Sequence, residues 1–246
     1  MKKIGLIPCR LESQRLPNKP LKIIEGIPMF AHVYYRSMLS NLDEVYICSD
    51  SKQIEESCKD LGIKIIMTSD LHSNGTERCS EAADILNLES SDLIIDIQGD
   101  EPLIDPDHIN HLIKNFKPDF MDIMVPFIKT TEQNNKNIVK IVSNSNGKIM
   151  YMSRYDIPYN FRNITTLKKH LSIIAFKKSK LKEFSELPIS QMELIEGIEL
   201  LRALESNFSI FTFELKGESR AVDTEQDLVI VRDLFKYDNL INKYEK

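Results

Sequence analysis

Hydrophobic and polar positions follow two different patterns along the chain, and the first half is the more regular. Up to residue 97, short continuous apolar runs are separated by segments in which apolar residues recur at helical spacing. Continuous apolar runs are typical of strands buried on both faces of a parallel sheet, which amphipathic helices then cover. The pattern predicts strands at residues 4–9, 44–48, 64–67 and 93–97, and helices at residues 29–39, 52–61 and 77–88.

The middle of the chain has strand patterns with little helix between them. We expect strands at residues 122–128, 138–142, 149–153 and 170–176. The last quarter predicts a helix at 193–204, a strand at 209–215 and a terminal helix at 224–235. Together these patterns predict one α/β domain over residues 1–246, with a mostly parallel mixed sheet and a small antiparallel region inserted at about residues 120–190.

Composition narrows the class of protein. The 246 residues are 42% hydrophobic and 28% charged, as in ordinary globular proteins. A net charge of −5 argues against a nucleic-acid partner, which usually needs a basic face, but it leaves anionic small molecules open. The first apolar run stops at Arg10 and no later stretch approaches a membrane span, so we expect a cytoplasmic protein without a membrane partner. Four widely spaced cysteines without a CxxC pair predict reduced, buried thiols.

A loop with three cations follows the first predicted strand. Arg10, Arg15 and Lys19 lie on it, and Pro17 and Pro20 restrict its backbone. Guanidinium and ammonium groups held at the carboxyl end of a strand suit a triphosphate. The loop has neither a GxGxxG nor a P-loop signature, which argues against a dinucleotide fold and a P-loop NTPase. From composition alone, a solvated basic loop is an equally good interpretation.

A second polar cluster follows the strongly apolar strand predicted at 93–97. Gln98 and Gly99 end this strand, and Asp100 and Glu101 come directly after them. Magnesium prefers carboxylate oxygens together with phosphate oxygens, and Gly99 permits a close approach of the backbone. The cluster therefore favours a magnesium site, with a surface turn as the alternative.

Two further segments carry weaker signals. Thr224 and Asp227 are explained by capping of the terminal helix, which leaves Asp223 over, and by itself Asp223 favours a structural role. Asn74 and Thr76 lie where a loop enters a helix, a place suited to a base or ribose, although an ordinary helix start fits as well. The histidines without partners at metal-ligand spacing are interpreted as structural or surface residues: His32, His72, His108 and His111.

Taken together, these segments resemble the 3-deoxy-manno-octulosonate cytidylyltransferases, also called CMP-KDO synthetases. The similarity extends nearly from end to end, with the motifs in the family's order. They are IPCRLESQRLPNKPL from Ile7, NGTER from Asn74, IQGDEPLI from Ile97, VKIV from Val139, MSRYDIPY from Met152 and AVDTEQDL from Ala221. The related enzymes for sialic-type acids usually carry GGSKGIPxKN in the first loop, so this loop is closer to the octulosonate branch.

The resemblance implies a Rossmann-like nucleotide-diphospho-sugar transferase fold and a homodimer. The implied reaction transfers CMP from CTP to the anomeric hydroxyl of an acidic 2-keto-3-deoxy sugar, KDO, with Mg²⁺ as cofactor and release of pyrophosphate, for lipopolysaccharide or capsule sugar activation. The implied catalytic residues are Arg10, Lys19, Asp100 and Asp223, the last two as metal ligands, which reverses the structural interpretation of Asp223. The implied substrate-binding residues are Ser13 and Arg15 in the first loop, Asn74, Gly75, Arg78 and Gln98 toward the nucleotide, and Arg154, His170 and Glu199 toward the sugar.

The segments expected at the sugar depart from the family pattern. The usual His-x-Gly-x-Tyr is here His170-Leu-Ser-Ile-Ile174, and the usual Leu-Glu-Gln-Leu-Arg is Ile198-Glu-Leu-Leu-Arg202. Ile174 and Leu200 thus replace a tyrosine hydroxyl and a glutamine amide, and each lost polar contact shifts discrimination by roughly 1–3 kcal/mol. The alternatives are an 8-amino octulosonate or a sialic acid relative as substrate, a different nucleotide, or a non-catalytic CTP-binding protein.

Overall fold

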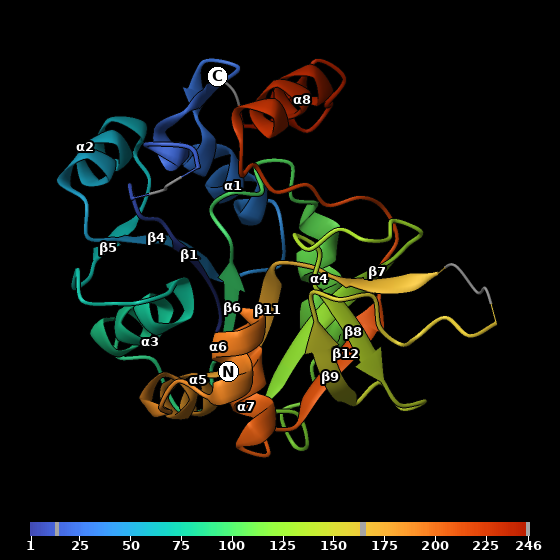
Figure 1. The fold of residues 1–246 in the computed structure, drawn as a ribbon. Coiled ribbons are helices and arrows are strands. Elements are labelled where there is room, and N and C mark those ends of the chain that lie inside the picture. The colour runs from blue at the N-terminus through green and yellow to red at the C-terminus, as the bar shows by residue number, and fades with distance from the viewer. Residues whose placement is uncertain (13–14, 163–165, 245–246) are drawn as a thin grey trace.

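The computed structural model describes residues 1–12, 15–162 and 166–244. Within these residues, ten strands form one mixed sheet in the order β5-β4-β1-β6-β11-β7-β10-β8-β9, with β12 beside β7 (Figure 1). Strands β5, β4, β1 and β6 are parallel, and β11 joins them to the rest of the sheet by antiparallel pairing with β6 and β7. The fold class expected from the sequence is confirmed, and the antiparallel strands extend the same sheet.

The bounds of the elements follow the chain order. The strands of this sheet are β1 Lys3–Pro8, β4 Glu44–Ser49, β5 Ile65–Met67, β6 Leu93–Ile97, β7 Ile123–Thr130, β8 Lys140–Ser143, β9 Ile149–Ser153, β10 Leu167–His170, β11 Ile173–Lys177 and β12 Ile210–Glu214. A separate hairpin pairs β2 Ile23–Ile24 with β3 Ile27–Pro28. The helices are α1 Met29–Met38, α2 Lys52–Leu61, α3 Gly75–Ile85, α4 Pro106–Asn115, α5 Lys178–Glu186, α6 Gln191–Glu196, α7 Leu200–Glu205 and α8 Glu225–Phe235, with short 3-10 turns at Lys19–Leu21 and Ile241–Lys243.

Helices cover both faces of the sheet because its strands are apolar on both sides. One core cluster receives Phe30 of α1, Ile54 of α2 and Leu112 of α4, and the opposite cluster receives Ala82 of α3 and Phe184 of α5. Side chains of β6 alternate between the two clusters, as the two-residue period of a strand requires. A third, smaller cluster packs α8 over the loop that follows β1 (Figure 1). The C-terminal helix therefore lies beside the cationic loop.

The structure contains two helices that the hydrophobic pattern does not predict, α4 and α5. Each buries few apolar residues: Ile109 and Leu112 anchor α4, and Leu181 and Phe184 anchor α5. Most of their other positions are polar or exposed, so no long apolar stripe marks them in the sequence. The apolar positions of these short helices are few, and packing of those positions against the sheet supports both helices.

Two expected elements are each divided in the structure, and the predictions of single elements there are wrong. The strand expected at 170–176 is β10 followed by β11, because Leu171 leaves β10 and donates its amide to the carbonyl of Pro126 on β7. The helix expected at 193–204 is α6 followed by α7. Gly197 ends α6 with a φ of 62°, a left-handed conformation that stops a helix. This division shapes one wall of the cleft described below.

Two other sequence-based expectations, on the cap of α8 and on the cysteines, are confirmed. Thr224 and Asp227 form a reciprocal capping box at the start of α8. All four cysteines are free and buried. Of the helices in the described part of the chain, none combines the length and apolarity needed to cross a membrane.

Candidate active site

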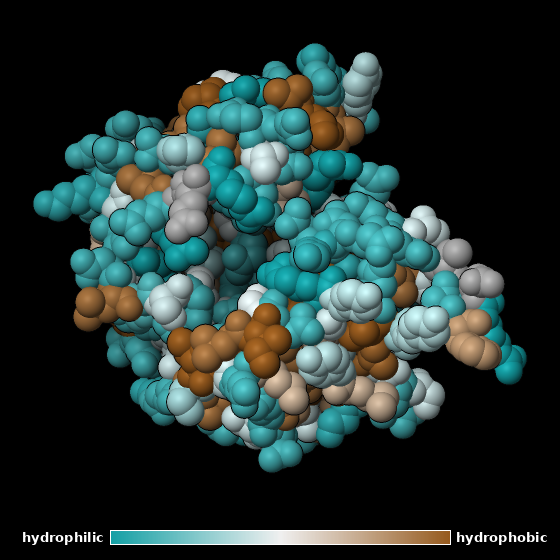
Figure 2. All heavy atoms as spheres, viewed as in Figure 1, coloured by the Kyte–Doolittle hydropathy of each residue, from teal (hydrophilic) through white to brown (hydrophobic). Residues whose placement is uncertain are grey.

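Strands β1 and β6 are parallel neighbours, so their carboxyl ends meet at one edge of the sheet. The loops that leave these ends, together with α3, the α6–α7 segment and the residues before α8, line a cleft of ≈ 1310 Å³. The view in Figure 2 shows a hollowed face with mostly hydrophilic residues around the hollow. This is the position at which ligands bind in open α/β sheets.

Lys19 is held at the mouth of this cleft by the short 3-10 turn that it begins. Asn18 precedes the turn in a left-handed conformation with a φ of 54°, and Pro20 within the turn is buried. The side chain of Lys19 is only 15% exposed, and its Nζ lies 2.6 Å from Asp100 Oδ2 and 3.2 Å from Asp223 Oδ1. The ammonium group is therefore oriented by two carboxylates rather than moving freely in solvent.

Asp100 and Asp223 are brought together although they lie far apart in the sequence. The amide of Val222 donates to the carbonyl of Asp100 at 2.8 Å, which ties the segment before α8 to the end of β6. Arg15 adds a further contact, with its guanidinium 3.1 Å from Asp223 Oδ1. Burial disfavours the charge of Lys19, but the two carboxylates outweigh it and raise its pKa. Lys19 thus stays a cation at all pH values near neutrality.

Gly99 is required by close packing where β6 ends. A Cβ at this position would lie 2.8 Å from the Sγ of Cys9 and 3.1 Å from the carbonyl oxygen of Pro8. Both neighbours belong to the end of β1, so a methyl group would push β1 and β6 apart at the cleft. The glycine permits the two loops to approach each other.

Gly99→Ala is expected to lower the free energy of unfolding by about 1–3 kcal/mol, the usual range for overpacking a tight site. The loss should exceed the gain of about 0.4–1 kcal/mol that alanine gives by restricting the unfolded chain. Urea denaturation of the purified variant measures the difference. An unchanged or raised unfolding free energy would show that the two loops can separate without cost.

The residues expected on the nucleotide side lie along one wall of the cleft. Asn74 caps α3 by accepting the amide of Glu77, and Gly75 packs so tightly that a Cβ would lie 2.9 Å from Pro8. Arg78 is buried, donates to Thr68 Oγ1 at 2.6 Å and pairs with Asp50 at 3.1 Å. Asn74, Gly75, Arg78 and Gln98 all line the cleft.

The residues expected at the sugar line the same cleft, and Glu199 lies directly beside α3, 2.7 Å from Thr76 Oγ1. Arg154 uses its guanidinium to hold the α6–α7 turn, donating to the carbonyls of Glu196 at 2.8 Å and Gly197 at 3.0 Å. The Nε2 of His170 is buried without a hydrogen-bond partner among the described residues, and burial lowers its pKa to about 4. Neutral His170 and the carboxylate of Glu199 both line the cleft, beside the apolar Ile174 and Leu200.

The cleft thus collects the implied catalytic and substrate-binding residues, with Ser13 as the exception. Ser13 lies outside the described residues. Thr76 and Glu101, which the sequence also marks, are buried and lie outside the lining residues. Arg10 is exposed and lines the cleft close to Lys19 in sequence, and Arg15 lines it beside Asp223. Cations, paired carboxylates and a mixed polar and apolar wall together can hold a metal-bound polyphosphate next to a second, hydroxyl-rich ligand.

Comparison with known proteins assigns the chain to a family. The family model described as Cytidylyltransferase matches residues 4–211. The chain belongs to the cytidylyltransferase family. The 3-deoxy-manno-octulosonate cytidylyltransferase of Lawsonia intracellularis is 40% identical over 237 residues, which are 94% of this chain and 92% of that protein. The 8-amino-3,8-dideoxy-manno-octulosonate cytidylyltransferase of Shewanella pealeana is 36% identical over 233 residues, 92% of this chain and 95% of that protein.

A solved structure of a related enzyme has the same fold as this cytidylyltransferase. It is the CMP:2-keto-3-deoxy-manno-octonic acid synthetase complexed with CTP, with a TM-score of 0.90 at 33% identity. The match covers 96% of this chain and 99% of that one. The likeness therefore includes both the parallel and the antiparallel parts of the sheet.

Sequence reasoning missed several polar residues that build the cleft of this cytidylyltransferase. Asp96 is buried within β6, and the hydroxyl group of Thr76 forms hydrogen bonds with both Asp96 and Glu199. Arg202 is buried and clamps Glu193 through two guanidinium bonds, which joins α7 to α6. A charged residue within the otherwise apolar run at 93–97 was the signal available for Asp96.

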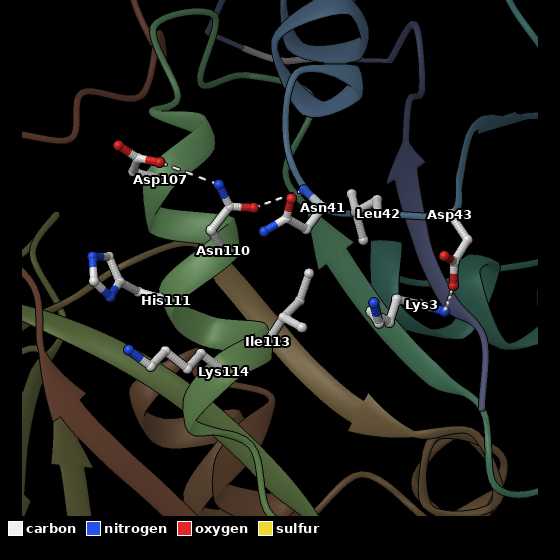
Figure 3. Close-up of a pocket in the computed structure, with 9 residues that line it drawn as sticks. All are labelled: Lys3, Asn41, Leu42, Asp43, Asp107, Asn110, His111, Ile113 and Lys114. Atoms are coloured by element: carbon white, nitrogen blue, oxygen red, sulfur yellow. Dashed lines mark hydrogen bonds between the residues drawn. The ribbon is translucent and has the colours of Figure 1, made fainter.

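A second hollow, of ≈ 750 Å³, lies near the start of β1 (Figure 3), whereas the cleft lies at the end of that strand. Its polar groups bond one another: the amide of Lys3 donates to Asp43 at 2.7 Å, and the amide of Asn41 donates to Asn110 at 2.7 Å. Figure 3 shows Asn110 also turned toward Asp107 on α4. The bond between Asn41 and Asn110 joins α4 to the segment between α1 and β4, and the residues that line this hollow are different from those that line the cleft.

Proposed function

We propose that this protein transfers CMP from CTP to the anomeric hydroxyl of a 2-keto-3-deoxy sugar acid, with KDO as the first candidate, and releases pyrophosphate. The observation that carries the proposal is the convergence of Lys19, Asp100 and Asp223 at the mouth of the cleft. The names of the relatives and the CTP in the matched structure support the nucleotide and the sugar class. The reaction is proposed to occur in the cytoplasm, where CTP is made, for activation of lipopolysaccharide or capsule sugar.

Asp100 and Asp223 are the residues that would hold Mg²⁺. Their carboxylate oxygens converge on one ammonium group, so this part of the cleft already stabilises a positive charge. Two carboxylates completed by phosphate oxygens are a donor set that Mg²⁺ prefers. When bound, the ion would neutralise phosphate charge and lower the pKa of a hydroxyl group that it contacts.

The cations of the first loop would bind and orient the triphosphate. Arg10 and Lys19 would neutralise the charge that builds on the departing pyrophosphate, and Arg15 would support the loop by its contact with Asp223. Ser13 is proposed to assist the same loop. The cytidine would bind against the wall formed by Asn74, Gly75, Arg78 and Gln98. In solution, the sugar acid and CTP are both anions and repel each other. Binding both in the cleft would place the sugar hydroxyl in line for attack on CTP.

The sugar acid would lie against the wall that contains Arg154, His170 and Glu199. The guanidinium of Arg154 donates hydrogen bonds to the backbone of the α6–α7 turn, so the proposed role of Arg154 is to shape the pocket. His170 presents an unpartnered ring nitrogen, and Glu199 presents a carboxylate that can accept a sugar hydroxyl. Ile174 and Leu200 make the remaining wall apolar, and this is the observation that keeps an 8-amino or other modified octulosonate as the second candidate.

The region at about residues 120–190 is proposed to serve sugar binding and assembly into a homodimer. Three aromatic side chains there, Tyr155, Tyr159 and Phe161, are exposed. The adjoining α6 exposes Leu194 and Ile195, and Figure 2 shows hydrophobic residues gathered on the face where Figure 1 places α6. Exposed apolar surface of this kind is typical of protein–protein contact.

A panel assay of pyrophosphate release tests the reaction and the substrate together. The purified protein with Mg²⁺ is expected to release pyrophosphate from CTP only when an octulosonate acid is added, and chelation of the metal should stop it. KDO, 8-amino-3,8-dideoxy-manno-octulosonate and a sialic acid are the sugar arms, and ATP, GTP and UTP are the nucleotide controls. Calorimetric binding of CTP without turnover on any sugar would contradict the proposal and favour a non-catalytic CTP-binding protein.

A further inference from the structure

A carboxyl group lies inside the central strand of the sheet, next to the sugar wall of the cleft. Asp96 of β6 is fully buried. Like Ile94, it occupies the strand positions that alternate with Ile95 and Ile97, and therefore faces the side covered by α3 and α7. Its close contacts are with neutral groups, Gln98 Nε2 at 2.9 Å and Thr76 Oγ1 at 3.0 Å. A buried carboxylate without a cation at this distance is costly, which favours the neutral acid.

The hydroxyl group of Thr76 lies between the carboxyl groups of Asp96 and Glu199 and restricts their protonation. Its Oγ1 lies 3.0 Å from Asp96 Oδ2 and 2.7 Å from Glu199 Oε1. A threonine hydroxyl has one hydrogen and can donate it to only one of these oxygens. If both carboxyl groups were ionised, the other contact would join two oxygens without a hydrogen between them. One of the two carboxyl groups must therefore carry a proton and donate it to Thr76.

Several observations assign this proton to Asp96 rather than to Glu199. Asp96 is fully buried, whereas Glu199 is partly exposed and lines the cleft. Gln98 donates to Asp96 Oδ1, which leaves Oδ2, the atom facing Thr76, to carry the hydrogen. Burial first, and the charge of Glu199 second, raise the pKa of Asp96 to about 7.

The charged and titratable groups around the pair agree with this assignment. The Asp96 side faces Cys79 of α3, a thiol whose own pKa burial raises well above its usual value. Burial raises the pKa of Glu199 as well, but Thr76 and the cation Arg202 lower it, whereas the groups that lower the pKa of Asp96 are all neutral. The groups that act on the pair are Thr76, Glu77 and Cys79 from α3, Gln98 after β6, Glu193 from α6 and Arg202 from α7, with Cys48 of β4 beside Cys79. The cation thus lies on the Glu199 side.

We propose that Asp96 is a protonated positioning residue, whose hydrogen bond passes through Thr76 and holds Glu199 as an oriented, ionised acceptor for a hydroxyl group of the sugar acid. The inference rests on the proposed function, because it assigns the work of Glu199 to sugar binding. When Asp96 loses its proton, two carboxylates compete for the single hydrogen of Thr76. Glu199 is then repelled by Asp96 and loses its fixed donor, so sugar binding weakens while the triphosphate part of the cleft is left unchanged.

Asp96→Asn tests this arrangement because asparagine matches the neutral acid at every pH. Its amide nitrogen can donate to Thr76 and its amide oxygen can accept from Gln98. In the native protein, KM for the sugar acid is expected to rise about 10-fold between pH 6 and pH 8.5, the effect of losing one charge-assisted hydrogen bond. The variant should show a flat KM for the sugar over this range, and KM for CTP should follow the same pH course in both proteins. Equal pH profiles for sugar KM in the two proteins would overturn the proposal.

Infrared spectroscopy locates the proton without relying on catalysis. The native protein at pH 6 is expected to show the C=O stretch of a buried protonated carboxyl group, which disappears on titration through about pH 7 and is missing from Asp96→Asn. Persistence of this band in Asp96→Asn together with its loss in Glu199→Gln would place the proton on the wrong partner and refute the assignment. Because these spectra need no substrate, a failure of the proposed reaction would remain distinguishable from a failure of the proton assignment.

Thermal stability supplies a second measurement that is independent of activity. The pKa of Asp96 is raised from its unfolded value near 3.9 to about 7 in the folded state, so the folded protein binds the extra proton between these values. The contribution of Asp96 to stability must therefore decrease as pH rises from about 4 to 7 and level off above 7. The Tm of Asp96→Asn relative to the native protein is expected to increase across this window. A Tm difference that is independent of pH would contradict the shifted titration.

Discussion

Asp100→Asn is expected to lower kcat by about 10³-fold, while CTP still binds measurably. Asparagine keeps the shape of the side chain but removes the negative charge that faces Lys19 at 2.6 Å and would face Mg²⁺. Most of the residues proposed to receive the cytidine belong to α3 and its N-cap, away from Asp100, so nucleotide affinity should survive in part. Steady-state pyrophosphate release at saturating substrates gives kcat, and isothermal calorimetry gives the affinity for CTP.

Asp60→Asn is the matched control for this variant. Asp60 is an exposed carboxylate on α2, outside the residues that line the cleft, and its loss should leave kcat within twofold. Thermal melting of both variants separates loss of chemistry from loss of fold. Near-normal turnover by Asp100→Asn at ordinary Mg²⁺ concentrations would defeat the assignment of Asp100 as a metal ligand.

Lys19→Gln is expected to lower kcat by about 10²-fold and to raise KM for CTP. The substitution removes a cation that is only 15% exposed and leaves Asp100 and Asp223 without their shared partner. Mutual repulsion should then displace these two carboxylates from their present positions. The triphosphate would also lose an oriented donor that cannot be replaced by solvent without reorganisation. Initial rates over a range of CTP concentrations separate the effect on kcat from the effect on KM.

Lys22→Gln provides a comparison with the same change of charge three residues further along. Lys22 lies beyond the cleft-lining residues and pairs with the exposed Glu225 at 3.1 Å. Exposed ion pairs contribute little, so this variant should keep both kinetic constants within about twofold. A similar loss of kcat in both variants would indicate that general charge, rather than the position of Lys19, supports the reaction.

The contrast between the two residues follows from where their partners lie. Lys19 is bonded to carboxylates supplied by the end of β6 and by the segment before α8, so it connects three separate parts of the chain. Lys22 is bonded to a single exposed residue of α8. A cation held by several elements is preorganised, and this is the property that electrostatic catalysis requires.

The sequence by itself determined the parallel half of the sheet and the place of the site. Continuous apolar runs are produced by burial on both faces of a strand, so β1, β4 and β6 were predictable from local composition. The position of ligands at the carboxyl ends of such strands then marked Lys19 and Asp100 in advance. Capping of α8 by Thr224 was equally local, because the bonding residues lie within one helical turn.

Only the tertiary structure decided which distant residues meet. Asp223 lies 204 positions from Lys19, and a hydrogen bond from Val222 to Asp100 brings it into the cleft, a contact that no local pattern encodes. Helices α4 and α5 form because neighbouring elements cover their few apolar residues. The buried contacts of Asp96 with Thr76, and of Thr76 with Glu199, likewise join strand β6 to two different helical segments. Periodicity reports which face of an element is buried, whereas long-range contacts depend on how all the elements pack.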